Sequence, residues 1–356
     1  MQQNNQTPSI IIEDVRIKFK GTTFSNYKKS LVIKKMIHAM YYQKLEEAFF
    51  WTSELICTHL YLDIWNTFFM FMSKYIHVYN PKLPILMNRK FKEFKQIAYE
   101  ISDDYQLRNN RKVRTLICSL TLILCLSNKY TILDDLNNKF NFKVENIYEN
   151  LKAPNIKYVE KYYLQHDPKE YIIPFNELIY HLVETKNKID INYWINWIIH
   201  YDSLCNTKKK YILCQQRDIF SCKNEKQSMN IIWILWDILL QLTEKKNKLV
   251  HEISKSLFDL FSVKYTVSFN KKRKYLIYNT VELFLHHNID YDIAILKQTK
   301  MLENLEKNVN VIFEQLKKNE ILHIDDPEEA KRQGIETKEK PKIDKMQIYQ
   351  DIYNNL

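Results

Sequence analysis

Apolar residues recur at intervals of three and four along most of this chain, which is the periodicity of amphipathic helices. Leu31, Met36 and Met40 begin the pattern, with lysines between them. The same spacing predicts further helices near 45–59, 62–79, 88–105 and 112–126, and again near 175–184, 191–201, 229–242, 249–261, 274–286 and 292–318. The pattern therefore predicts an all-α protein.

Two short segments depart from helical spacing. Residues 9–20 alternate after an isoleucine run, which favours one short strand or an extended arm, and residues 265–269 favour a small strand. Pro81 and Pro84 interrupt the helical pattern, because the residue before a proline is pushed out of the α region.

The periodic segments form two groups, so we predict a two-lobed protein. Residues 1–25 form an N-terminal arm, 26–126 the first helical lobe, 127–174 an irregular connection with three prolines, and 175–320 the second helical lobe. Residues 321–345 are charged, which indicates a linker. In the tail 346–356, four residues form a short amphipathic pattern: Ile348, Tyr349, Ile352 and Tyr353. We expect this tail to dock on a partner, or alternatively to pack on its own domain.

Glycine is the residue type whose count most restricts the fold. Only Gly21 and Gly334 occur in 356 residues. Glycine supplies positive φ in tight turns and lets backbone approach a phosphate closely. A Gly-rich nucleotide-binding loop is therefore excluded, and helices, which need glycine least, are favoured.

Known catalytic patterns are absent from the sequence. It contains no G-x-S-x-G, H-E-x-x-H, G-K-[ST] or EF-hand pattern. His200, Cys205, Cys214 and Cys222 lie near one another, but they lack the pairs two to five residues apart that structural zinc sites use. We therefore expect no catalytic residues, no metal site and no cofactor, and we expect that the protein is not an enzyme.

The chain carries a net charge of +11, which favours a polyanionic partner. Abundant Lys, Asn, Ile and Tyr indicate A/T-rich codons, so part of the lysine content reflects codon bias. Phosphate contact requires cations on a rigid surface. The candidate nucleic-acid-binding residues are Lys28, Lys29, Lys34, Lys35, Arg108, Arg111, Lys112, Arg114, Lys271, Lys272, Arg273 and Lys274, and another basic run spans Lys208, Lys209 and Lys210.

The sequence also indicates where the protein is found. Residues 1–8 are polar and uncharged, unlike a secretory signal peptide, and no apolar stretch of about 18 residues occurs. The six cysteines form no C-x-x-C pair. We expect a reduced, soluble, intracellular protein that does not bind a membrane; a homo-oligomer and a subunit of a larger assembly both stay open.

Residues 30–83 contain a helical pattern with a known counterpart. It runs through Ala39-Met40, Glu47-Ala48-Phe49-Phe50-Trp51, Leu62-Asp63-Ile64-Trp65, Met72-Ser73 and Asn80-Pro81. It resembles the helical C-terminal region of clamp-loader-related AAA+ proteins of the MgsA and Werner-helicase-interacting type. The acidic pair of that family is replaced after Ser73 by Lys74 and Tyr75, and its ATPase and lid modules are absent. The resemblance implies a collar-like or oligomerising element associated with DNA replication or repair, without ATP turnover. In general character the chain also resembles proteins of large DNA viruses.

These observations favour a non-catalytic, basic accessory or scaffold protein that contacts the phosphate backbone of nucleic acid. No base specificity is expected, because no recognition-helix motif occurs. The alternative is a structural or assembly protein, such as a minor virion component, that binds acidic protein surfaces. A third reading, a divergent enzyme, requires a polar pocket with perturbed titratable groups.

Overall fold

The computed structural model describes residues 11–130, 140, 142 and 147–317. Helices carry nearly all of their regular structure, and extended pairing is confined to isolated bridges between Thr22 and Lys28 and between Leu213 and Asn230. The predicted all-α class is confirmed. Residues 11–19 have no regular secondary structure, so the short strand considered there is not formed. The small strand expected at 265–269 is wrong, because turns there lead directly into a helix.

The chain divides into two compact units, which we describe separately. Among the described residues, unit 1 comprises 11–71, 89–129 and 294–317, and unit 2 comprises 72–88, 130, 140, 142 and 147–293. Their membership differs from the expected lobes 26–126 and 175–320. Residues 72–88 belong to unit 2, where Ser73 accepts a hydrogen bond from Asn279. The last described helix belongs to unit 1, to which a buried ion pair holds it.

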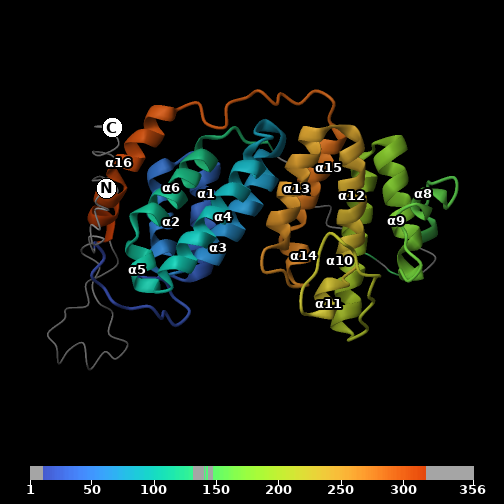
Figure 1. Ribbon diagram of the computed structural model, residues 1–356, viewed down its shortest axis with the longest axis horizontal. Coiled ribbons are helices and arrows are strands. Elements are labelled where there is room, and N and C mark those ends of the chain that lie inside the picture. Colours follow the sequence, from blue (N-terminus) through green and yellow to red (C-terminus); the bar gives the residue numbers. More distant parts are fainter. Residues whose placement is uncertain (1–10, 131–139, 141, 143–146, 318–356) are drawn as a thin grey trace, which may run out of the picture. The chain divides into compact units, whose positions relative to one another are not determined.

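Unit 1 is built from helices whose apolar faces meet around buried aromatic residues. Trp65, Phe68, Phe69 and Phe91 lie within this core. Helix α6 packs against α2 on one side and against α16 on another (Figure 1). The helices are α1 (Lys29–Tyr41), α2 (Leu45–Cys57), α3 (Tyr61–Phe71), α5 (Asp104–Asn109), α6 (Arg111–Leu126) and α16 (Thr299–Lys317), and α4 (Leu83–Ile101) contributes its residues from Arg89 onward.

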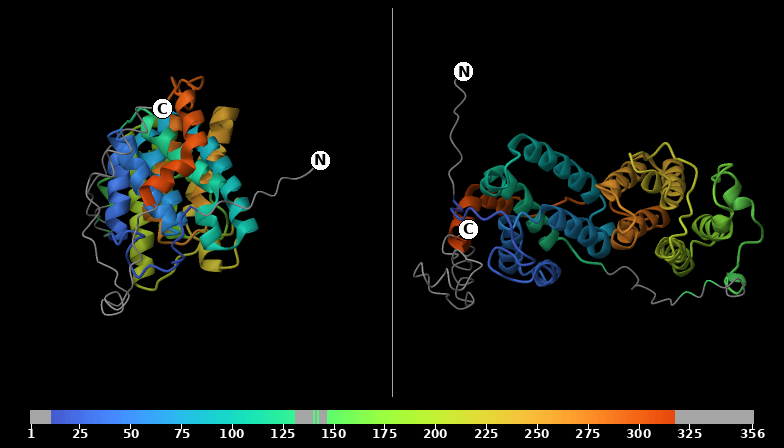
Figure 2. Two further views of the ribbon diagram at one scale, coloured as in Figure 1. Left: turned by 90° about the vertical axis from the view of Figure 1, so that its left-hand side faces the viewer. Right: turned by 90° about the horizontal axis from the view of Figure 1, so that it is seen from below.

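Unit 2 centres on tryptophan-rich helices. Trp194, Trp197, Trp233 and Trp236 lie in its core, and all four are buried. Helices α12, α13 and α15 pack against one another (Figures 1 and 2). The elements are η1 (Met72–Ile76), η2 (His77–Tyr79), α8 (Lys157–Glu160), η3 (Lys169–Tyr171), α9 (Ile172–Tyr180), η4 (His181–Thr185), α10 (Lys188–Thr207), α11 (Glu225–Ser228), α12 (Ile232–Lys246), α13 (Lys248–Ser262), α14 (Phe269–Lys272) and α15 (Lys274–Leu285).

A chain with so little glycine must end its helices with other residues. Three helices end in a turn whose left-handed position is held by Gln43 (φ 57°), His59 (φ 61°) and Lys209 (φ 57°) after α1, α2 and α10. In each turn the next residue donates its N–H to a carbonyl five positions back, as Lys210 does to Cys205 at 2.8 Å. This is the Schellman motif, whose left-handed residue is usually glycine.

Glycine at such a position should stabilise the protein. A left-handed backbone costs a non-glycine residue about 1–2 kcal/mol, and Gln43 is exposed with few contacts to lose. We expect Gln43→Gly to raise the free energy of unfolding of unit 1 by about 1 kcal/mol. Hydrogen exchange of peptides from α1 and α2 measures this change. Gln43→Ala is the control, since alanine keeps the strain; equal stability of both variants would contradict the explanation.

Candidate functional site

Two of the arginines predicted to contact phosphate are buried structural residues. Arg108 is 0% exposed and donates to the carbonyls of Arg16 and Cys57, both at 3.1 Å, and to that of Asp14. Arg114, also 0% exposed, donates to the carbonyl of Arg108 at 2.9 Å. Their role as phosphate contacts is therefore wrong. Arg108 donates to the C-terminal carbonyl of α2 and to carbonyls of the N-terminal arm. In the sequence, an arginine with this structural role looks the same as one that binds a ligand.

Two other residues predicted to contact phosphate lie between these arginines and remain on the surface. Arg111 is exposed, but its guanidinium donates to the carbonyl of Glu306 in α16 at 3.0 Å. Lys112 is exposed. The segment 108–114 therefore joins α16 and the N-terminal arm to unit 1 more than it faces solvent.

The prediction that Arg273, in unit 2, contacts phosphate is also wrong. Arg273 is 2% exposed, it donates to the carbonyls of Phe261 and Val263, both at 2.6 Å, and it lies over the ring of Phe269. Burial lowers the pKa of its guanidinium to about 10, so it stays charged at neutral pH. Arg273 therefore caps the C-terminal end of α13 and does not reach a ligand.

Replacing this cap should destabilise unit 2. Arg273→Met keeps much of the side-chain volume but leaves two carbonyls without their donor, at a cost of about 2–3 kcal/mol. The urea midpoint of unit 2, followed by tryptophan fluorescence, measures the loss. Lys272→Met changes the exposed neighbour and should shift stability by less than about 0.5 kcal/mol. Equal, small shifts in both variants would show that the cap contributes little.

The lysines of α1 and Lys28, which directly precedes this helix, lie at the surface of unit 1. Lys28, Lys34 and Lys35 are exposed, whereas Lys29 pairs with Asp63 at 2.8 Å. Among the other candidates in unit 2, Lys271 and Lys272 are exposed, and Lys274 is half-buried beside Asn196. The docking residues Ile348, Tyr349, Ile352 and Tyr353 lie outside the described residues.

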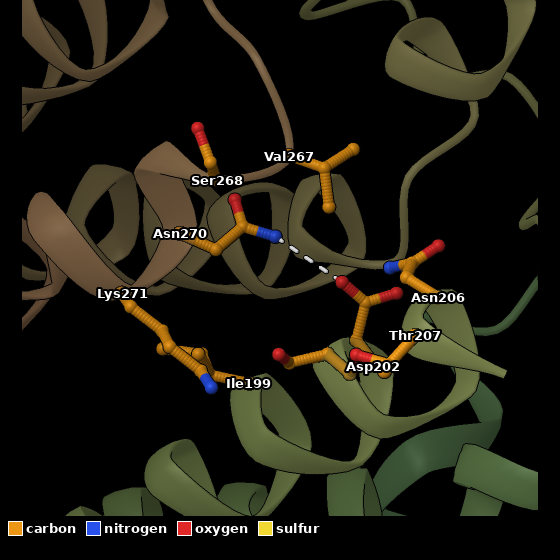
Figure 3. Close-up of a pocket in the computed structure, with 9 residues that line it drawn as sticks. Ile199, Asp202, Asn206, Thr207, Val267, Ser268, Asn270 and Lys271 are labelled. Carbon is orange, nitrogen blue, oxygen red and sulfur yellow. Dashed lines mark hydrogen bonds between the residues drawn. The ribbon is translucent and has the colours of Figure 1, made fainter.

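A polar pocket lies in unit 2 between the end of α10 and the start of α14 (Figure 3). Its volume is about 330 Å³, near the lower end of small-ligand pockets. The α10 side contributes Asp202 and Asn206, which lie four positions apart and so share one helix face. Val267, Asn270 and Lys271 line the opposite side. The periodicity of α10 brings these polar residues to one cavity.

Asp202 is the unusual residue of this pocket, because it is a carboxylate that is 2% exposed. Asn230 donates to its two oxygens at 3.4 and 3.3 Å, and Asn270 donates to one of them at 3.4 Å. Tyr265 in turn donates its hydroxyl to Asn270 at 2.7 Å, which fixes the orientation of that amide. Each bond to Asp202 is longer than the usual 2.9 Å, so the carboxylate keeps acceptor capacity.

This environment shifts the pKa of the Asp202 carboxyl. Burial raises the pKa of its carboxyl to about 6, and the neighbouring carboxamides and the charge of Lys271 oppose that rise. Buried groups with displaced pKa values cluster at functional sites, although structural networks also contain them. The pocket required by the divergent-enzyme reading is therefore present, and its lining also holds the hydroxyls of Ser203, Thr207 and Ser268. Among the described residues, none of these hydroxyls hydrogen-bonds Asp202, whose bonds come from carboxamides.

Exposed lysines border the mouth of the pocket. Lys271 lines the cavity and Lys272 follows it, while Lys208, Lys209 and Lys210 directly follow Thr207, another lining residue. We call these five residues the lysine rim. All five are exposed, and within the described part of the chain none of them forms an ion pair. The fold thus brings together two basic segments about sixty positions apart in sequence.

The cysteines near this pocket do not form a metal site. Cys205 and Cys214 are buried, and Cys214 donates its thiol to the carbonyl of Asn230 at 3.3 Å. Among residues 11–130, 140, 142 and 147–317, no group of three or more His, Cys, Asp or Glu side chains is placed to hold a metal ion. The same residues include no helix long and apolar enough to cross a bilayer.

Sequence reasoning missed Asp202, Asn206, Asn230 and Asn270. One signal was available, since Asp202 lies four positions after Ile198 and eight after Trp194, on the face that periodicity assigns to the core. The helix expected at 191–201 ended one residue too early to include it. Comparison with known proteins adds no further guide, because no family model, curated protein or solved structure matches this chain.

Proposed function

We propose that this protein is a non-catalytic nucleic-acid-associated accessory protein that holds the phosphate backbone of a single strand at the lysine rim of unit 2. The observation that carries the proposal is that Lys271 lines the pocket, while Lys208 directly follows Thr207, which lines the same pocket. Unpaired lysines on a rigid helix end attract phosphates and release counterions when they bind.

A single strand suits this surface better than a duplex. The cavity between α10 and α14 is small and lined mainly by polar residues, and an unpaired strand can place one nucleotide in it while its backbone follows the lysines. The structural alternative, an assembly protein that binds acidic protein surfaces, would use the same charges without any need for the cavity. Nucleic-acid binding would use both the exposed lysines and the cavity beside them.

Fluorescence anisotropy of the full chain with labelled single strands and duplexes, repeated at several salt concentrations, tests this proposal. For single strands, the logarithm of the association constant should fall with the logarithm of salt at a slope near −0.7 per phosphate contact, so five contacts give about −3.5. Duplex should bind more weakly. Absence of binding even at low salt would overturn the proposal and leave the assembly alternative.

A further inference from the structure

The N-terminal arm is held to unit 1 along one edge by side chains of α5. The carbonyl oxygens of Ile12, Asp14 and Arg16 accept hydrogen bonds from Asn109 and Arg108. The carboxamide of Asn109 also accepts from the backbone N–H of Ile12 at 2.9 Å. In a strand, the backbone groups of every second residue point the same way. From Ile12 to Arg16 the arm therefore bonds as a strand does, with side chains of α5 in place of a neighbouring strand.

The residues between those three form the opposite edge of the arm. Glu13, Val15 and Ile17 have exposed side chains, and Val15 and Ile17 are 70% and 46% exposed. Their backbone N–H and C=O groups make no hydrogen bond within the part of the chain that the structure describes. An edge with unpaired backbone groups and exposed apolar side chains is a template for a second strand.

A second copy of the same arm matches this edge. In an antiparallel pair, every second residue of one strand exchanges two N–H···O=C bonds with the residue opposite it. If the two arms cross with Val15 on the two-fold axis, Val15 pairs with Val15 of the second copy, and Glu13 pairs with Ile17. This register uses the N–H and the C=O of all three unpaired residues on both arms. The edge is thus complementary to itself, as a two-fold interface requires.

The charges of the arm favour the same antiparallel register. It places Asp14 directly opposite Arg16 of the second copy, and opposite charges at such positions stabilise a sheet. Parallel arms in register would instead place Asp14 beside Asp14 and Arg16 beside Arg16. Asp14 and Arg16 already pair within one arm at 2.6 Å, so the four groups would alternate in sign. On the other face, Val15 would contact Val15 of the second copy, which removes apolar surface from water.

We propose that two copies of this protein pair through their N-terminal arms, in an antiparallel two-stranded ribbon centred on Val15. The proposal is independent of nucleic-acid binding, because the arm belongs to unit 1 and the lysine rim to unit 2. A ribbon of two strands is a small interface with marginal stability, so the dimer should be weak and should depend on protein concentration.

Sedimentation velocity of the full chain, from about 3 to about 300 µM, measures this association. We expect the average mass to rise with concentration from 43.3 kDa toward twice that value. Val15→Pro removes the central N–H from both arms, so it should raise the dissociation constant about tenfold or more. Val15→Thr is the matched control, because it keeps the N–H and the branched side chain, and it should change the constant less than about threefold.

Cysteine cross-linking tests the register and does not depend on the proline variant. Across the two-fold axis the two Val15 Cα atoms would lie about 5.5 Å apart, within the range of a disulfide. Val15→Cys should therefore form a covalent dimer when diamide oxidises the two thiols. Glu13→Cys is equally exposed in class, but its counterpart would lie about 13 Å away along the strand, so it should link much more slowly. Wild type reports any linking through the native cysteines.

Three outcomes would overturn the proposal. The first is a chain that stays monomeric at every concentration. The second is a dimer of equal strength in wild type and Val15→Pro. The third is cross-linking of Glu13→Cys as fast as that of Val15→Cys, which would mean that the arms meet without this register. None of these outcomes bears on binding at the lysine rim, which is measured separately.

Discussion

Lys317→Met should destabilise unit 1 by about 3–5 kcal/mol, the usual cost of removing one partner from a buried ion pair. Lys317 and Glu54 are both fully buried and in direct contact, which joins α16 to α2. Ser25 also bonds Glu54, through its backbone N–H at 2.6 Å and its hydroxyl at 2.7 Å. Without Lys317, the carboxylate remains buried with no countercharge, so α16 should detach from α6.

The pH dependence of this effect has a definite sign. Burial alone would raise the pKa of Glu54, but the Lys317 ammonium and the bonds from Ser25 hold it below its ordinary value of 4.5. A depressed pKa contributes stability that is present above pH 4.5 and is lost as pH falls through the folded-state pKa. The difference between wild type and Lys317→Met should therefore shrink as the pH falls below about 4.5.

Hydrogen exchange of peptides from α2, α6 and α16, at neutral pH and near pH 4, measures both effects. Lys307→Met is a matched control on the same helix, because Lys307 is exposed, and it should change protection little. If Lys317→Met left α16 as protected as in wild type, the ion pair would not be what holds that helix.

The second large effect concerns the lysine rim. Replacing Lys208, Lys210, Lys271 and Lys272 together with glutamine should weaken single-strand binding about 10–100-fold at low salt, and should make the salt slope shallower by about 3, or 0.7 for each of four contacts. These four side chains are exposed, so the fold should survive their replacement. Anisotropy titrations at several salt concentrations measure both quantities.

The matched control removes the same charge from unit 1. Lys28, Lys34, Lys35 and Lys112 are exposed and were also predicted to contact phosphate. Their joint replacement by glutamine should reduce affinity less than threefold, through the general loss of positive field. If this control lost as much affinity as the rim variant, binding would follow net charge and the rim would have no special role.

The all-α class was predictable because apolar spacing and scarce glycine point to the same structure. Positions of helices within each unit also followed from periodicity. Periodicity did not predict that α16 belongs to unit 1, because the partner of Lys317 is Glu54, more than 260 positions earlier. A lysine at the end of a sparsely apolar helix looks solvated in sequence, and only the folded chain shows the buried carboxylate that it meets.

The basic clusters were the least predictable part of the site. Arg108, Arg114 and Arg273 were predicted to contact phosphate, yet all three bond carbonyl oxygens inside the protein. Arginine can donate five hydrogen bonds and remains charged when buried, so it serves helix ends as readily as ligands. The lysines at 208–210 keep exposed side chains, and they directly follow Thr207, which lines the pocket.

Lysine footprinting tests the location of nucleic-acid binding most directly. The full chain is acetylated with and without a saturating abasic single strand, and modification of each lysine is quantified by mass spectrometry. We expect protection of Lys208, Lys209, Lys210, Lys271 and Lys272, with Lys28, Lys34 and Lys35 unchanged. Protection confined to the α1 lysines, or an identical pattern with and without the strand, would contradict it.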